Sequence, residues 1–145
     1  ITVTGVPDRP GAAASILRPV SDARIQVDMI VMNSPRDGCV DLSFSVGRDD
    51  FAEAIALAGR VAASLGAGEV RGNDTVAKIS IVGVGMRSHA GIATRLFETL
   101  AVEGIHVRMV STSEIKISVL VPESEMESAV RALHRVFLVD RPDTP

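Results

Sequence analysis

The sequence contains no Trp and no Tyr, and only four of its 145 residues are Phe. A core built from this chain must therefore be aliphatic, made of Val, Ile, Leu, Ala and Met. Cysteine occurs once, at Cys39, which excludes an internal disulfide framework and fits a reducing cytoplasm. Because no partner for nucleophilic chemistry is evident, Cys39 is interpreted as a small apolar residue in a strand.

Charge and hydrophobic length exclude further classes of protein. The chain has 15 Lys and Arg against 18 Asp and Glu, so it carries no general positive field, and we expect neither a nucleic-acid nor a membrane partner. No apolar run approaches the roughly 20 residues that span a bilayer. The start, Ile1-Thr2-Val3, lacks the features of a signal peptide and an initiator Met, so we interpret the chain as a fragment or as missing its first residues.

The common catalytic and metal-binding motifs are also missing from the sequence. It has no Walker-type phosphate loop, no G-x-S-x-G elbow and no H-E-x-x-H pair. The three histidines, His89, His106 and His134, are scattered without the spacing of metal ligands. We therefore expect no catalytic residue and no metal site in this chain.

What the sequence does contain is an internal repeat. The matching segments are Ile1–Val6 with Ile79–Val84, Gly11–Ile25 with Gly91–Ile105, and Val27–Ile30 with Val107–Val110. The offset is 78 residues before the first loop and 80 after it, so this loop is two residues longer in the second copy. The repeat predicts two copies of one structural unit, residues 1–74 and 75–145.

Hydrophobic periodicity assigns the elements of both copies. In the first copy it predicts strands at 1–6, 27–32, 40–46 and 69–71, and helices at 11–25 and 51–65. In the second it predicts strands at 79–84, 107–111 and 115–121, and helices at 91–105 and 126–137. Each copy is thus βαββα, with a final strand clear only in the first, and two helices on one face of an antiparallel sheet give an α+β fold.

Three residues are expected to shape the helices of the first copy. Pro19 should kink helix 11–25 or limit its hydrogen bonding, because proline has no N–H to donate. Asp49 or Asp50 is a plausible N-cap for helix 51–65.

The loop between the first strand and the first helix of each copy is the best candidate for a binding site. A helix N-terminus presents free N–H groups that suit a ligand carboxylate, and Gly11 and Gly91 let a ligand approach the backbone. Asp8 and Asp28 offer carboxylates that could take an ammonium group. Such a pairing suits an α-amino acid, while the simpler interpretation is a tight turn with a capping Asp.

Four segments resemble aspartate kinases. Gly5–Gly11 (GVPDRPG) looks like the G-[IV]-x-D-[KR]-P-G loop of that family's first ACT domain, and Val82–His89 looks like its VGxGM[KR]S loop. Ser111–Val119 (STSEIKISV) closely matches the STSEI[RK]ISV segment of the second ACT domain, and Ala129–Phe137 resembles the closing helix. Because the segments follow in order across nearly the whole chain, it is identified as a member of the family's regulatory region.

The resemblance implies two ferredoxin-like βαββαβ ACT domains in tandem. It implies a cytoplasmic enzyme that phosphorylates the β-carboxyl of aspartate with ATP and Mg, on the route to lysine, threonine, methionine and isoleucine. The kinase domain would be N-terminal to this chain, which by itself would be non-catalytic. Its partners would be an aspartate kinase catalytic domain or α subunit, and a second copy in a homodimer formed through the ACT domains. Effectors, namely threonine and/or lysine, would bind at the contact between ACT domains.

The family's effector-binding positions fall on two groups of residues in this sequence. The first group is Asp8, Arg9, Pro10, Gly11, Ala12, Ala13, Gln26, Val27, Asp28 and Met32. The second group is Ile92, Ala93, His106, Val107, Ser113 and Glu114. Met32, Ala93 and His106 stand where Gln, Thr and Asn are usual in threonine-sensitive members, and Arg108 replaces a usual Glu. Each of the first three changes removes or alters a polar contact with a bound amino acid, which should lower affinity.

Two further interpretations remain at this point. The ACT pair could be insensitive to effectors and serve mainly for dimerisation and assembly, as the substitutions at Met32, Ala93 and His106 favour. It could also be a small enzyme with the same ferredoxin-like fold, such as an acylphosphatase. That enzyme needs an Arg and an Asn on a phosphate loop, which the sequence does not show, and the tandem repeat argues against it.

Overall fold

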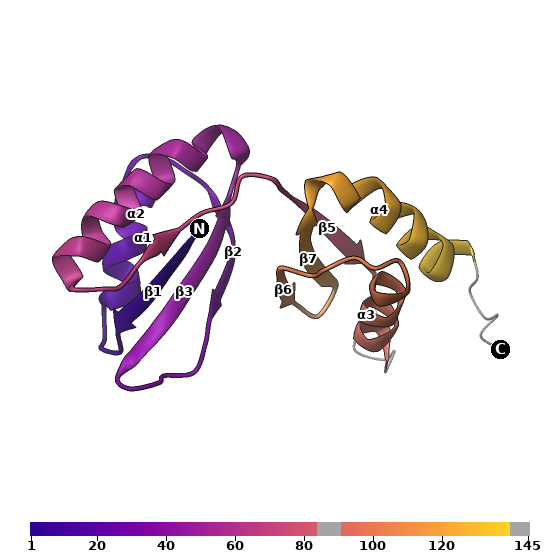
Figure 1. Cartoon of the computed structure of the whole chain (residues 1–145), viewed down its shortest axis with the longest axis horizontal. Helices are drawn as coiled ribbons and strands as arrows, with labels where there is room; N and C mark the ends of the chain where they lie inside the picture. Colours follow the sequence, from indigo (N-terminus) through magenta and orange to yellow (C-terminus); the bar gives the residue numbers. More distant parts are fainter. Residues whose placement is uncertain (84–90, 140–145) are drawn as a thin grey trace. The chain divides into compact units, whose positions relative to one another are not determined.

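The computed structural model describes residues 1–83 and 91–139. The chain forms two compact units, Ile1–Asp74 and Thr75–Pro145, which we call unit 1 and unit 2 (Figure 1). Each unit has its own hydrophobic core and is described by itself below.

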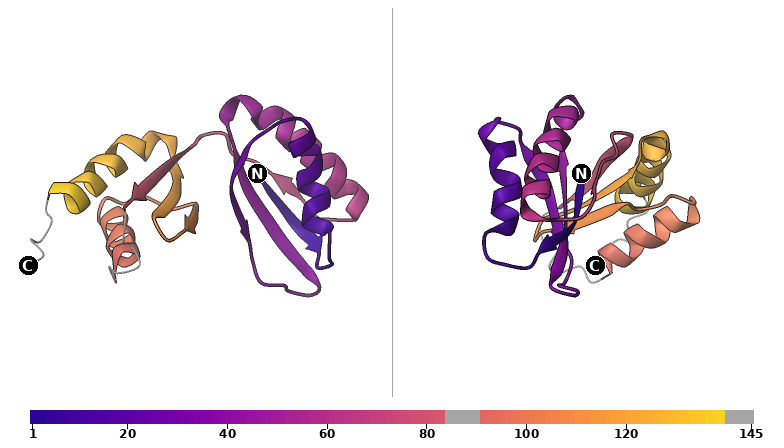
Figure 2. Two further views of the ribbon diagram at one scale, coloured as in Figure 1. Left: turned by 180° about the vertical axis from the view of Figure 1, so that it is seen from behind. Right: turned by 60° about the vertical axis from the view of Figure 1, so that its left-hand side comes forward.

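Unit 1 is a four-stranded antiparallel sheet with both helices on one face (Figure 2). Its elements are β1 (Thr2–Pro7), α1 (Ala12–Asp22), β2 (Val27–Met32), β3 (Cys39–Val46), α2 (Phe51–Leu65) and β4 (Val70–Arg71). The strand order is β2-β3-β1-β4, with β2 and β4 at the edges. This arrangement confirms the predicted βαββαβ pattern of the first copy, with each strand within two residues of its predicted bounds.

Unit 2 repeats this pattern with a three-stranded sheet. Its elements are β5 (Val76–Val82), α3 (Ile92–Val102), β6 (Met109–Thr112), β7 (Lys116–Pro122) and α4 (Met126–His134). The order is β5-β7-β6, and within the described residues no strand follows α4. The predicted α+β class is confirmed.

The interior of unit 1 depends on a bulge in β1. Val3 and Val6 are both fully buried although they are three residues apart, whereas a regular strand would turn them to opposite faces. The register of β1 with β3 shifts between them, and Gly5 takes a positive φ of 61° there. Asp41 Oδ1 accepts a hydrogen bond from Gly5 N at 3.0 Å and fixes the bulge.

The helices of unit 1 pack through small residues. Ala54, Ala58 and Ala62 form the buried stripe of α2, and Ile16 and Val20 form that of α1. All five belong to one aliphatic cluster. Phe44 is the largest side chain fully buried in the described residues, so the expected aliphatic core holds with one aromatic exception.

The start of α2 differs from the predicted side-chain cap. A 3₁₀ turn, Arg48–Asp50, leads directly into the helix, and Asp50 has near-helical backbone angles (φ −94°, ψ −6°) with no capping hydrogen bond from its side chain. A capping residue must be extended to aim its oxygen at the first turn, so the continuous turn removes that geometry. Asp50 therefore occupies the predicted N-cap position, but its side chain does not cap the helix.

The end of α4 also differs from the expectation. The periodicity predicts one helix through Phe137, but α4 ends at His134 and continues as a π-helical turn, Arg135–Val139. In a π turn each hydrogen bond spans one residue more than in an α-helix. A single such turn leaves the spacing of apolar residues almost unchanged, so the sequence does not predict it.

None of the helices in the described ranges has the length and apolar character needed to cross a bilayer.

Candidate functional site

The loop that joins β1 to α1 leaves the start of the helix open. Gly11 occupies the N-cap position with a positive φ of 88°, and no side chain caps α1. Backbone bonds hold the loop: Asp8 N donates to Gly38 O at 2.9 Å, and Ala12 N donates to Arg9 O at 3.2 Å. The expected capping Asp is wrong, because Asp8 makes no cap and is exposed, whereas the expected tight turn is present at residues 9–12.

The same construction occurs in unit 2. Gly91 is the N-cap of α3 with φ 90°, and again no side chain caps the helix. The residues that precede it, including His89 and most of the Val82–His89 motif, lie outside the described residues. Both copies of the repeat therefore begin their first helix with a left-handed glycine and no side-chain cap. Each of these helix starts presents partial positive charge.

Strand register shows which predicted residues of unit 1 share an end of the sheet. Pro7 pairs with Cys39 and Met32 pairs with Leu42, which places Met32 at the same end as the Asp8–Ala13 loop. Val27 pairs with Val46, so Gln26, Val27 and Asp28 stand at the opposite end. Five residues of strand separate Val27 from Met32, about 16 Å at about 3.3 Å per residue.

A ligand on the N-terminus of α1 therefore does not meet Asp28 within unit 1. Of the two carboxylates singled out from the sequence, Asp8 alone lies beside the helix start. This separation follows from the order strand, helix, strand, since Asp8 follows β1 and Asp28 lies at the start of β2, and the register of both strands with β3 confirms it.

Unit 2 divides its predicted residues in the same way. Val82 pairs with Lys116, and Ser113 N donates to Lys116 O at 2.7 Å. Ile92 and Ala93 on the first turn of α3 thus share an end with Ser113 and Glu114 of the β6–β7 turn. His106 and Val107 lie before β6, at the opposite end.

The exposed surface around the α1 start is small at Pro10 and Gly11 and charged at Asp8 and Arg9. Asp8, Arg9, Pro10 and Gly11 are exposed, Ala12 is buried and Ala13 is half-buried. Small side chains let a ligand reach the first N–H groups of the helix. Within the described ranges, no cluster of three or more His, Cys, Asp or Glu side chains has a geometry that could hold a metal ion.

Comparison with known proteins defines the class of this fold and site. The family model described as ACT domain matches residues 79–137. The crystal structure of aspartokinase alpha and beta subunits superposes with a TM-score of 0.86 at 51% identity, covering 94% of this chain and 89% of that chain. The ligand-free regulatory subunit of aspartate kinase from Thermus thermophilus has a TM-score of 0.86 at 35% identity, covering 94% and 89%. The molecule is therefore a regulatory ACT-domain protein.

Full-length relatives agree with the solved structures. An aspartokinase of Pseudomonas aeruginosa is 52% identical over 142 residues, which are 98% of this chain and 34% of that protein. An aspartokinase of Mycolicibacterium smegmatis is 40% identical over 94% of this chain and 33% of its own length. This chain belongs to the aspartate kinase family and corresponds to its regulatory region. It spans about a third of the length of the curated relatives that it matches.

Proposed function

We propose that this chain is an amino-acid sensor that controls the phosphorylation of aspartate by a kinase domain. The observation that carries the proposal is the uncapped start of α1 behind Gly11, in a member of the aspartate kinase regulatory family. An α-amino acid places its carboxylate on the free N–H groups, where the helix dipole stabilises negative charge. Its ammonium group faces Asp8, which the same loop holds at the helix start.

Threonine and/or lysine is the effector that this proposal names, on the strength of the family resemblance. In each unit the family's effector positions divide between opposite ends of the sheet. A site that uses residues from both ends is therefore composite, formed where ACT domains meet in the assembled protein. Regulation then requires that the effector bind two states of the assembly with different affinity, a coupling of typically about 1–3 kcal/mol.

The catalytic partner belongs to the same proposal. ATP and Mg bind in the kinase domain, which is supplied by a catalytic domain or an α subunit in the cytoplasm. The proposal gives the residues of this chain no role in phosphoryl transfer.

A homodimer through the ACT domains follows from the surface of β2. This edge strand of unit 1 exposes Ile30 at 49% and Met32 at 48%, and apolar side chains on an unprotected edge favour pairing with another strand. Side-by-side joining of two sheets covers both residues.

The second candidate function is an assembly module without feedback. Met32 is the observation that favours it, because its exposed thioether lies at the end of the sheet where the effector loop is, in place of the usual Gln. A thioether offers only a weak acceptor, so a polar effector gains little there.

Calorimetric titration of the chain with threonine, lysine, methionine and glycine separates the two functions. A sensor gives saturable heat with threonine or lysine and none with glycine, and its melting temperature rises with ligand concentration. An assembly module gives neither signal with any of the four.

Asp8→Ala, with Asp28→Ala as its matched control, tests the ammonium contact. We expect affinity for the effector to fall roughly 10- to 150-fold in Asp8→Ala, as for loss of a charged hydrogen bond. Asp28→Ala reports on the opposite end of the sheet. Unchanged affinity in Asp8→Ala would remove Asp8 from the site, whatever the control shows.

A further inference from the structure

A groove of about 340 Å³ runs between α3 and α4 on the helical face of unit 2. Its residues are Arg95, Glu98, Thr99, Val102, Glu103, Ala132, Arg135 and Val136. None of them was proposed as a site residue from the sequence, and the groove does not include the loop before α1. Its size lies within the range of small-molecule sites.

One residue difference between the repeats contributes space to this groove. Helices α2 and α4 each follow directly on a 3₁₀ turn, Arg48–Asp50 and Glu123–Glu125, and this aligns them with an offset of 75 residues. Ala132 then occupies the position of Leu57, which packs against the core of unit 1. Replacing Leu by Ala removes three carbon atoms between the helices and leaves the space open.

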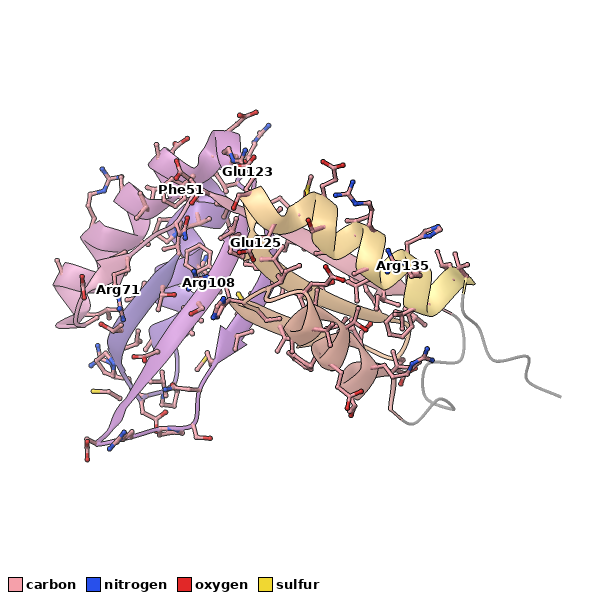
Figure 3. The ribbon with its side chains drawn as sticks, turned by 45° about the vertical axis from the view of Figure 1, so that its right-hand side comes forward. Phe51, Arg71, Arg108, Glu123, Glu125 and Arg135 are labelled. Carbon is pink, nitrogen blue, oxygen red and sulfur yellow. The ribbon has the colours of Figure 1, made fainter. Side chains whose placement is uncertain are left out.

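The two ends of the groove carry opposite charge. Arg95 Nη2 donates to Val136 O at 3.0 Å, and the guanidinium carbon lies 5.2 Å from the centre of the Phe137 ring, which places Arg95 beside the π-helical turn. Arg135 begins that turn and lies at the C-terminal end of α4 (Figure 3). Glu103 is eight residues further along α3 than Arg95, so the groove spans about 12 Å at about 1.5 Å per residue, and Glu98 lies between them, about 4.5 Å from Arg95 along the helix.

The charged groups at the two ends are available. Glu98, Glu103 and Arg135 are exposed and take part in no ion pair among the described residues. Arg95 keeps further N–H groups beyond the one bonded to Val136, because a guanidinium has five. Between the ends lie apolar groups: Val102, exposed at 86%, together with Ala132 and Val136.

We propose that this groove binds a linear zwitterion whose carboxylate and ammonium are separated by an aliphatic chain. The carboxylate pairs with Arg95 and Arg135, the ammonium pairs with Glu103 at the far end, and the methylene groups cover Val102 and Ala132. Charge complementarity along the groove selects this class over an anion or a cation alone. The site is independent of the proposed effector loop, since a ligand without an α-amino group fits it.

The probe is 6-aminohexanoate, compared with hexanoate and pentylamine, which each keep one charge. Because exposed ion pairs contribute little individually, we expect millimolar binding of 6-aminohexanoate and about two- to fivefold weaker binding of either comparison compound. Calorimetry or amide chemical-shift titration of the whole chain measures the affinity for each of the three compounds. Shift changes should concentrate on α3 and α4 rather than on α1.

Two variants locate the site. Ala132→Leu restores the side chain found in unit 1 and should abolish binding by filling the groove. Arg135→Ala, on an exposed position that cannot prevent folding, should weaken binding about two- to fivefold, while Arg60→Ala at the equivalent place in unit 1 should not. Absence of binding by 6-aminohexanoate, or equal binding by wild type and Arg135→Ala, would overturn the proposal. Failure of threonine and lysine to bind at the loop leaves it standing, so the two ideas fail separately.

Discussion

Arg24 adopts a left-handed backbone conformation, with φ 62°, just after α1. The equivalent residue of the second copy is Gly104, with φ 70°, also one residue past the C-cap of its helix. A side chain in this conformation is strained against its own carbonyl, and glycine is not. We predict that Arg24→Gly raises the free energy of unfolding by about 0.5–1 kcal/mol in urea denaturation.

Gly104→Ala is the reciprocal change and should lower the free energy of unfolding by about 1 kcal/mol. No atom lies within 4 Å of a Cβ at Gly104, so backbone strain is the only cost there. Equal stability of Arg24→Gly and wild type would show that Arg24 is not strained.

Position 68 requires glycine for a different reason: there is no space for a side chain, and the backbone angle φ is not the cause. A Cβ added there would lie 2.8 Å from Thr4 Oγ1 and 3.1 Å from Thr4 O, because Gly68 N bonds Thr4 O at 2.7 Å. Gly68→Ala should destabilise unit 1 by about 1–3 kcal/mol through this clash. Gly59→Ala, inside α2 with no atom within 4 Å of the new Cβ, should instead stabilise it by about 0.5–1 kcal/mol. Thermal unfolding of the pair distinguishes the two effects, and a stable Gly68→Ala would contradict the close approach.

At the scale of the element, α1 carries the proposed sensing. Ala14 is exposed on its first turn, three residues after the N-cap Gly11. A negative charge there complements the helix dipole but repels a bound carboxylate. Ala14→Glu should therefore raise the free energy of unfolding by about 0.3–1 kcal/mol and at the same time weaken effector binding.

Ala14→Lys is the matched control. It should lower the free energy of unfolding and strengthen effector binding, the reverse of Ala14→Glu. Denaturation and calorimetry on the same two proteins give the comparison. If the two variants bound the effector equally, the carboxylate would not be on this helix end, even if their stabilities differed as expected.

At the scale of the whole molecule, the proposed dimer depends on the exposed edge of β2. We predict that the chain forms a dimer that Ile30→Lys or Met32→Lys dissociates, because a charge on an edge strand opposes pairing. Analytical ultracentrifugation measures the association. Ile115→Lys alters a residue of unit 2 that is exposed at 54% and should leave the dimer intact.

The sequence by itself determined the repeat, the α+β class, the order of elements and the family. These follow from short-range patterns: alternation in Cys39–Val46, a three- and four-residue apolar period in α2, and the two Gly-containing loops. The family motifs are equally local, which is why Gly5–Gly11 and Ser111–Val119 are readable without a structure.

Only the tertiary structure decided which of these residues share a site. Asp8 and Asp28 have the same chemistry, but the sheet puts Asp8 beside the α1 start and Asp28 at the other end of β2, about 13 Å along the strand from Met32. Three local features also appeared only in the structure: the bulge at Gly5, the 3₁₀ turn before α2 and the π turn after α4. Each changes the backbone by less than one repeat of the strand or helix, so the spacing of apolar residues in the sequence does not reveal it. The groove at Ala132 likewise exists only because two helices are brought side by side, where a missing side chain leaves space between them.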